Sequence, residues 1–142
     1  MDILAAALLL FVILEVSNVV VLYFAPGSRA ANGVGVFRAY EKSKEDHEVH
    51  AMVTYLIHWV AGSKVIFIAL LVGVVLVGNP EIKVFSVFAL ILSVLTFFWR
   101  LYPAVKAMDA AGQIVPRGYS RTLARIILGL VAVFVGALLL YR

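Results

Sequence analysis

Four polar side chains that could do chemistry lie inside apolar stretches of this sequence. Glu15 and Asn18 interrupt a first apolar run, and His58 and Lys64 interrupt a second. Glu15 and Asn18 are three residues apart, so they share one face of a helix. A charged side chain at the centre of a membrane helix is costly, about 2.5–3.5 kcal/mol for lysine on the insertion scale. Opposite charges at the same depth are therefore expected to pair.

The depth of each group follows from the rise of a helix. Counted from the loop edge of its helix at about 1.5 Å per residue, Glu15 lies about 13 Å deep and Lys64 about 13–18 Å. Asn18 is near the level of His58, one to two turns closer to the loop. The sequence therefore predicts an intramembrane ion pair between Glu15 and Lys64, with Asn18 and His58 beside it.

These groups predict a ligand site. We expect an intramembrane polar pocket, open to the cytoplasmic leaflet, that binds or moves a lipid-like or small anionic molecule. The predicted ligand-binding residues are Glu15, Asn18, His58, Lys64, Arg100 and Arg125. In the alternative interpretation the pair only fixes helix register and stability, which fits an accessory or structural subunit of a larger membrane complex. The sequence leaves open whether the protein is an enzyme.

The elements that must position these residues are four apolar segments. The chain is 64% hydrophobic and 14% charged, with mean hydropathy +1.06, whereas soluble domains are about 45–50% apolar and about 25% charged. Residues 3–24, 51–78, 82–102 and 122–141 each approach or exceed the roughly 20 residues that cross a bilayer. We predict an all-α, multi-pass cell-membrane protein, in which residues 1–142 form one bundle of four transmembrane helices.

Local signals set the ends of these segments. Pro26 and Gly27 end the first, and Gly78, Asn79 and Pro80 form a tight hairpin between the second and third. Residues 37–49 are polar with high helix propensity, so they are expected along the membrane surface or as an extension of the second helix. A kink is expected at Pro103.

Orientation follows from the basic residues. Residues 25–50 and 103–121, with the adjoining helix ends, lie on one side of the membrane and the hairpin and termini on the other. The first side carries nine basic residues: Arg29, Arg38, Lys42, Lys44, Arg100, Lys106, Arg117, Arg121 and Arg125. The second carries only Lys83 and Arg142. Because basic loops stay inside, both loops are predicted to be cytoplasmic and both the N-terminus and the C-terminus outside.

Composition excludes several chemistries. Cysteine is absent, which rules out disulfides, thiolate metal ligands and a cysteine nucleophile. The net charge of +4 is expected to face membrane lipid and not nucleic acid. Asp46 and His50 are one helical turn apart and could offer two metal ligands, but no third is expected nearby, so we predict no metal and no resident cofactor.

One stripe of small residues points to self-association. Gly129, Ala132 and Gly136 are spaced by three and four, the pattern by which membrane helices approach closely. We predict a homo-oligomer, either a dimer or a trimer.

A short motif before the second segment gives a resemblance. In the stretch from Arg38 to Glu45, RAYEKSKE, Arg38, Ala39 and Glu45 match the R-A-x-x-N-x-x-E stretch of the membrane-associated eicosanoid and glutathione metabolism (MAPEG) family, while Lys42 replaces its asparagine. The chain also resembles that family in length and in having four spans. The resemblance implies a glutathione-dependent membrane transferase, a homotrimer with glutathione as cofactor, and Arg38 and Glu45 among its contacts.

Overall fold

A computed structural model describes residues 2–141, which form an all-helical chain. Its α-helices are α1 Ile3–Phe24, α2 Arg38–Ser43, α3 His47–Val77, α4 Pro80–Leu95, α5 Leu101–Ala110 and α6 Tyr119–Leu140. Two 3₁₀ turns, Val34–Val36 and Thr96–Phe98, precede α2 and follow α4. Four helical units are long and apolar enough to span a membrane: α1, α3, α4 with α5, and α6. The predicted all-α class with four apolar spans is confirmed.

Polar caps set the helix starts at the end of the bundle that holds both termini. The Asp2 carboxylate accepts from the backbone N–H of Ala5 at 2.7 Å and from Lys83 Nζ at 2.8 Å. These bonds hold the pKa of Asp2 below its ordinary value, the Lys83 bond contributing most. Asn79 caps α4 by accepting from the Ile82 N–H. The hairpin is therefore built as its sequence predicts.

The helical extension before the second span is divided in two. Residues 44–46 form a turn between α2 and α3. Asp46 caps α3, because its side chain accepts from the backbone N–H groups of Glu48 and Val49. As a result α3 begins at His47, four residues before the predicted start of the span.

The third span differs most from expectation. Its helix is interrupted at residues 96–100, upstream of Pro103, and then continues as α5 to Ala110, although residues 103–121 were expected to be loop. Pro103 has no N–H to donate to the carbonyl of Trp99, and its ring crowds that carbonyl, so the helix yields in the preceding turn. Thr96 Oγ1 also donates to the Ser93 carbonyl at 2.6 Å. The predicted kink is thus a break placed several residues earlier.

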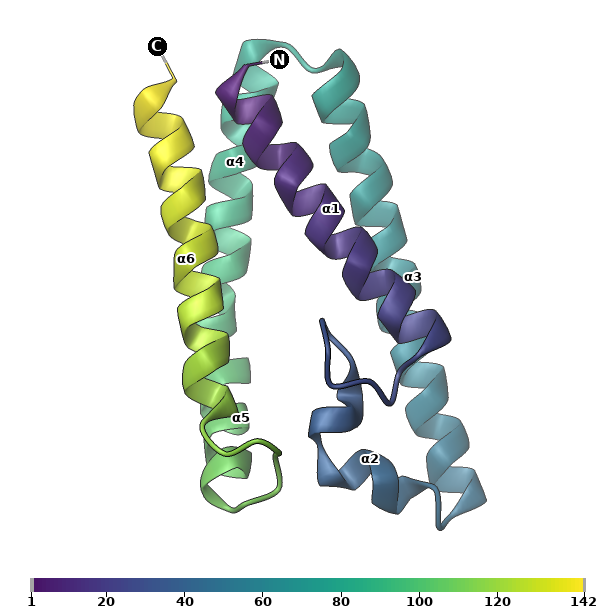
Figure 1. The fold of residues 1–142 in the computed structure, drawn as a ribbon. Coiled ribbons are helices and arrows are strands. Elements are labelled where there is room, and N and C mark those ends of the chain that lie inside the picture. The colour runs from purple at the N-terminus through teal and green to yellow at the C-terminus, as the bar shows by residue number, and fades with distance from the viewer. Residues whose placement is uncertain (1, 142) are drawn as a thin grey trace.

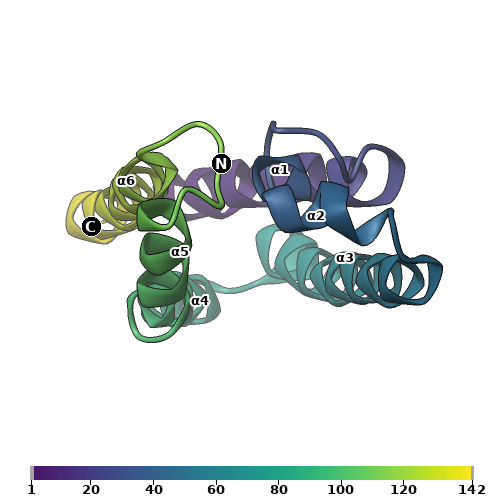
Figure 2. The same cartoon turned by 90° about the horizontal axis from the view of Figure 1, so that it is seen from below.

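The helices form two pairs that diverge from a common core (Figures 1 and 2). At the end with the termini, all four long helices share one apolar cluster that includes Leu8, Phe11, Leu71, Val87 and Phe134. Toward the other end, α1 stays against α3, whereas α4 and α5 stay against α6.

The diverging pairs are joined again at the end with the basic loops. The Val115 N–H donates to the Val36 carbonyl at 2.9 Å, and the Arg38 N–H donates to the Gln113 carbonyl at 3.0 Å. Val36 and Ile114 are buried in a small cluster with Val105. We call residues 34–43, which make this connection from the α3 side, the strap.

Candidate functional site

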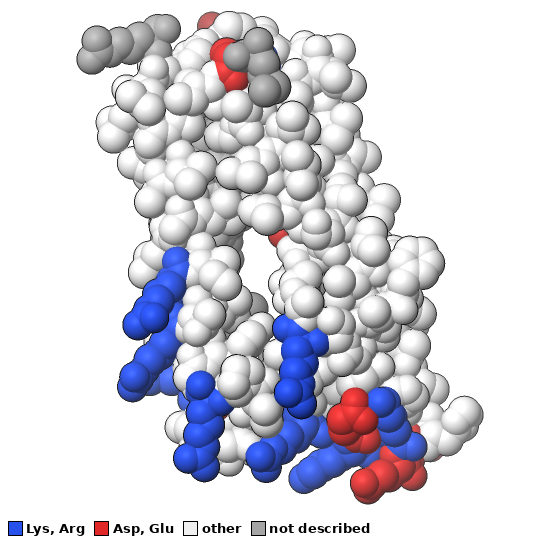
Figure 3. All heavy atoms as spheres, viewed as in Figure 1, with Lys and Arg blue, Asp and Glu red and all other residues white. Residues whose placement is uncertain are grey.

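A groove lies between the two helix pairs. Its volume is about 550 Å³, and Figure 3 shows the molecule hollowed between the pairs, with an acidic group at the edge of the hollow. The lining residues come from all four spans: Phe11, Glu15, Trp59, Val60, Ser63, Lys64, Phe67, Leu90, Ser93, Val94, Ile127 and Leu130. The wall is therefore mostly apolar, with two charged groups and two hydroxyls.

The charged groups of the groove are bonded directly to each other. Lys64 Nζ donates to Glu15 Oε2, and Asn18 Nδ2 donates to Glu15 Oε1 at 3.3 Å. The side chain of Glu15 is 12% exposed and that of Lys64 is 25% exposed. Each carboxylate oxygen thus has a donor, and the opposite charges compensate each other at the edge of the groove.

Lys64 keeps hydrogen-bonding capacity toward the groove. An ammonium group has three N–H donors, and the bond to Glu15 uses one of them. Ser93 contributes a hydroxyl from α4 across the groove, and Ser63 contributes one from α3. Ser63 Oγ already donates to the Trp59 carbonyl at 3.0 Å, so it can only accept from a ligand. The polar part of the groove therefore offers the remaining N–H donors of Lys64 and the hydroxyls of Ser63 and Ser93.

The groove takes Phe11 and Leu90 from the shared apolar core. The strap and residues 113–115 contribute no lining residue. The hollow in Figure 3 opens between the two helix pairs, with basic side chains near its lower rim.

Four of the six predicted site residues are outside the groove lining. Asn18 is bonded to Glu15 but does not itself line the groove. His58 is exposed and packs against Tyr23, with ring centroids 5.6 Å apart and ring planes tilted by 34°. Arg100 is exposed and lies over the Trp99 ring at 5.6 Å, and Arg125 is exposed on α6. Depth along a helix does not give the face on which a residue lies. His58 is six residues from Lys64, so at about 100° per residue the two side chains point about 120° apart around α3.

Ser93 is a polar lining residue that was not predicted from the sequence. It is a polar residue inside the third apolar segment, which is the same signal that identified Glu15 and Lys64 in theirs. Its hydroxyl costs much less in an apolar segment than a charge does, so the signal is weaker. A search of the apolar segments for hydroxyl side chains as well as charged ones would have identified Ser93.

The predicted glutathione contacts lie elsewhere. Arg38 is the first residue of α2 and Glu45 lies in the turn after it, both exposed. Neither lines the groove. The resemblance that singled them out stays a prediction.

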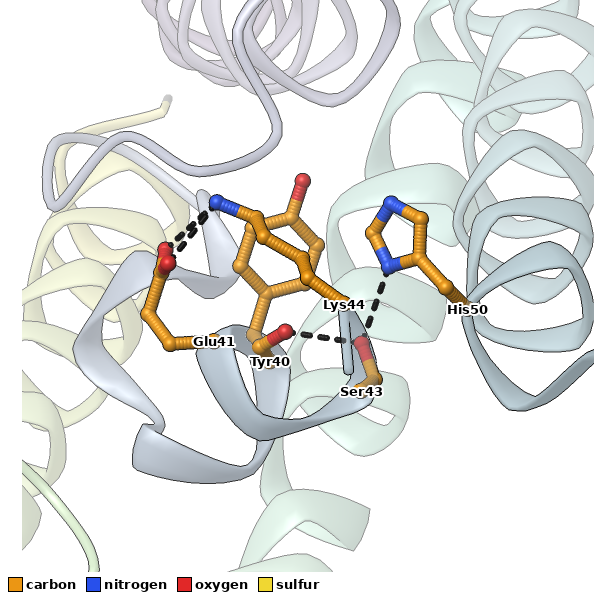
Figure 4. A network of polar contacts seen from close by, with 5 residues as sticks. All are labelled: Tyr40, Glu41, Ser43, Lys44 and His50. Atoms are coloured by element: carbon orange, nitrogen blue, oxygen red, sulfur yellow. Dashed lines mark hydrogen bonds and ion pairs between the residues drawn. The ribbon is translucent and has the colours of Figure 1, made fainter. Parts of the chain in front are cut away.

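The remaining polar residues around α2 serve local structure (Figure 4). Ser43 Oγ donates to the Tyr40 carbonyl at 2.7 Å and lies 2.9 Å from His50 Nδ1. A hydroxyl has one proton, so His50 Nδ1 is the donor in the second bond. Lys44 donates to both oxygens of Glu41, which raises the pKa of Lys44. The network fastens the strap to α3.

The histidines and acids near α3 do not assemble a metal site in residues 2–141, where no group of three or more candidate ligands is found. Asp46 caps α3 through two backbone N–H groups. His50 is bonded to Ser43. Asp46 and His50, the two potential metal ligands, are therefore already engaged in hydrogen bonds within the protein.

The fold and groove define a class: a small helical bundle with four apolar spans and a paired acid and base between them. Comparisons with protein-family models, with curated proteins and with solved structures give no match. The groove is therefore the feature of this chain that bears on its function.

Proposed function

We propose that this is a multi-pass cell-membrane protein that binds an amphipathic, lipid-like molecule in the groove between its helix pairs. The observation that carries the proposal is the apolar groove with the Glu15–Lys64 pair at its edge, open between the helices. The apolar body of the ligand lies along the walls that include Phe11, Phe67 and Leu130. Its polar group binds the remaining N–H donors of Lys64 and the Ser93 hydroxyl.

The direct ion pair favours a lipid-like ligand over a small anion. Glu15 already compensates the charge of Lys64, so an anion would have to displace a carboxylate that is itself bonded to Asn18. A molecule with a large apolar part gains about 25 cal/mol for each Å² of its surface that leaves water. In a bilayer, such a molecule also lies beside the opening of the groove between the helices.

The placement in the membrane belongs to the same proposal. The basic loops face the cytoplasm and both termini face outside, because nine of the eleven basic residues in the described range lie at the loop end. The small-residue stripe supports a homo-oligomer: a Cβ added at Gly129 or Gly136 would meet nothing within 4 Å in the protomer. The stripe is therefore free for a second copy, as a dimer or a trimer.

A second candidate, an accessory subunit without a ligand, is favoured by the directness of the pair itself. A carboxylate and an ammonium that join α1 to α3 are sufficient to fix the packing of those helices. The two candidates differ in whether anything occupies the groove.

Filling the groove tests the proposal. We expect Ile127→Trp to reduce strongly, by about tenfold, the amount of a specific lipid that co-purifies in mild detergent, because the indole occupies the space of the ligand; 1.4 kcal/mol of lost binding gives this factor. Lipid extraction and mass spectrometry, normalised to protein, measure the effect. The matched control is Ile126→Trp, since Ile126 is the adjacent residue, is 61% exposed and lies outside the groove.

The two variants separate the candidates. Retention of the lipid by Ile126→Trp with loss in Ile127→Trp supports the groove as a binding site. Equal lipid content in the two variants, or no lipid enriched over the bulk membrane in the native protein, would contradict it and leave the accessory subunit.

A further inference from the structure

The basic residues at the loop end are distributed unequally over the two helix pairs. Residues 25–50, next to α3, contain four basic and four acidic residues. Residues 96–125, around α5 and the start of α6, contain five basic residues and only one acid. We call this second stretch the basic arm, and its basic residues are Arg100, Lys106, Arg117, Arg121 and Arg125.

The one acid of the basic arm is engaged in a turn. Asp109 Oδ1 accepts from the Gly118 N–H at 3.0 Å. Its Oδ2 accepts from the Ser120 N–H at 2.9 Å and from Ser120 Oγ at 2.7 Å. The carboxylate therefore holds the connection between α5 and α6. Ion pairs within residues 2–141 involve Lys44, Lys64 and Lys83, and none of the basic arm.

The arginines of this arm are presented near the depth of an aromatic anchor. Trp99 is 75% exposed, and the Arg100 guanidinium lies over its ring at 5.6 Å. Tyr119 and Leu123 pack around the cluster that contains Val105, so one further turn of α6 reaches the level where α5 begins. Arg125 thus comes near the level of Arg100.

Arg121 and Arg125 are one helical turn apart, are exposed and belong to the same face of α6. Guanidinium groups bind phosphate oxygens through paired N–H donors. An exposed tryptophan beside arginines is typical of the membrane interface, where lipid phosphates lie.

We propose that the basic arm is a binding surface for the phosphate headgroups of anionic phospholipids in the leaflet on the loop side. This site differs from the groove. It binds the charged headgroups of bulk lipid, whereas the groove binds the apolar body of one molecule. It requires that the protein is in a membrane, but it does not require that the groove is occupied. Figure 3 shows the basic side chains gathered at this end of the molecule.

The test compares two double variants that remove the same charge. Short-chain phosphatidylglycerol is titrated into the detergent-solubilised full-length protein, and its apparent affinity is taken from the shift in the thermal midpoint. Each basic residue near an anionic membrane surface contributes about 1 kcal/mol, so we expect Arg121→Gln with Arg125→Gln to weaken the affinity about 30-fold. Lys42→Gln with Lys44→Gln, on the charge-balanced side, should leave it within about twofold.

Additional titrations and variants identify the source of the phosphate. Inorganic phosphate and short-chain phosphatidylcholine at the same concentrations should give no comparable shift. The pair Arg121→Lys and Arg125→Lys keeps the charge and should retain most of the affinity, which also shows that the helix tolerates substitution there. An equal shift with inorganic phosphate or phosphatidylcholine would overturn the proposal. So would an unchanged affinity in the arginine-to-glutamine variant. Lipid retention by Ile127→Trp is measured separately, so failure of the groove would leave this result unaffected.

Discussion

Glu15→Gln and Lys64→Met are each expected to lower the free energy of unfolding by about 3 kcal/mol, because each leaves the other charge without its partner. The estimate is at the lower end of the range for buried pairs, since Lys64 is 25% exposed. The double variant removes both charges, so we expect it to recover most of that loss. Equilibrium unfolding of the purified protein in detergent measures all three variants.

The matched control is the other ion pair between distant helices. Asp2 and Lys83 are also bonded, at 2.8 Å, but the Asp2 side chain is 37% exposed at the end of the bundle. Asp2→Asn with Lys83→Met should therefore change stability much less than the single variants at Glu15 and Lys64 do. If single variants at Glu15 and Lys64 cost no more than this control, the pair contributes little to the fold.

The same double variant separates packing from binding. Glu15→Gln with Lys64→Met keeps the apolar walls of the groove but removes the ammonium donors. Recovered stability together with lost lipid retention would mean that Lys64 binds the polar group of the ligand. Recovered stability with native lipid content would mean that the pair only joins α1 to α3, and that the polar end of the ligand lies elsewhere.

The four apolar spans were predictable because hydrophobic length and charge asymmetry are properties of the sequence alone. The contact between Glu15 and Lys64 was expected for a related reason: two opposite charges at one depth have few other partners in an apolar bundle. A contact that depends only on depth along each helix can thus be predicted from a single sequence.

Angular position and helix continuity were harder to predict. His58, Arg100 and Arg125 have about the expected depth but lie outside the groove lining, because rotation of each helix is set by packing that spacing does not encode. The break at residues 96–100 depends on where strain from Pro103 is relieved, which is decided by neighbouring side chains. The strap was not foreseen, because it consists of backbone bonds between two loops far apart in the chain.

Gly35→Ala is expected to destabilise the protein by about 1–3 kcal/mol, the usual cost of an added methyl group that its surroundings cannot admit. A Cβ at Gly35 would lie 1.9 Å from the carbonyl oxygen of Gly27 and 2.6 Å from its carbon. Both obstacles are backbone atoms, so a rotamer change cannot relieve the contact. The chain at this point must move away from residues 27–28.

That movement should open the strap first. The next residue, Val36, is 2% exposed and accepts from the Val115 N–H through its carbonyl. Displacing it weakens the connection that joins the two helix pairs at the loop end. Hydrogen exchange should therefore accelerate at the amides of Val115 and Arg38 before it does so in the shared core around Phe134.

Gly73→Ala is the control for the same substitution in open surroundings, because Gly73 lies inside α3 and outside the small-residue stripe. A Cβ added at Gly73 would meet nothing within 4 Å, and alanine is favoured over glycine in a helix by about 0.5–1 kcal/mol. We expect equal or greater stability and unchanged exchange at Val115 and Arg38. If Gly35→Ala also leaves these amides protected, the strap is not held by the close approach of residues 27 and 35, and the apolar contacts of Val36 with Val105 and Ile114 join the helix pairs at the loop end instead.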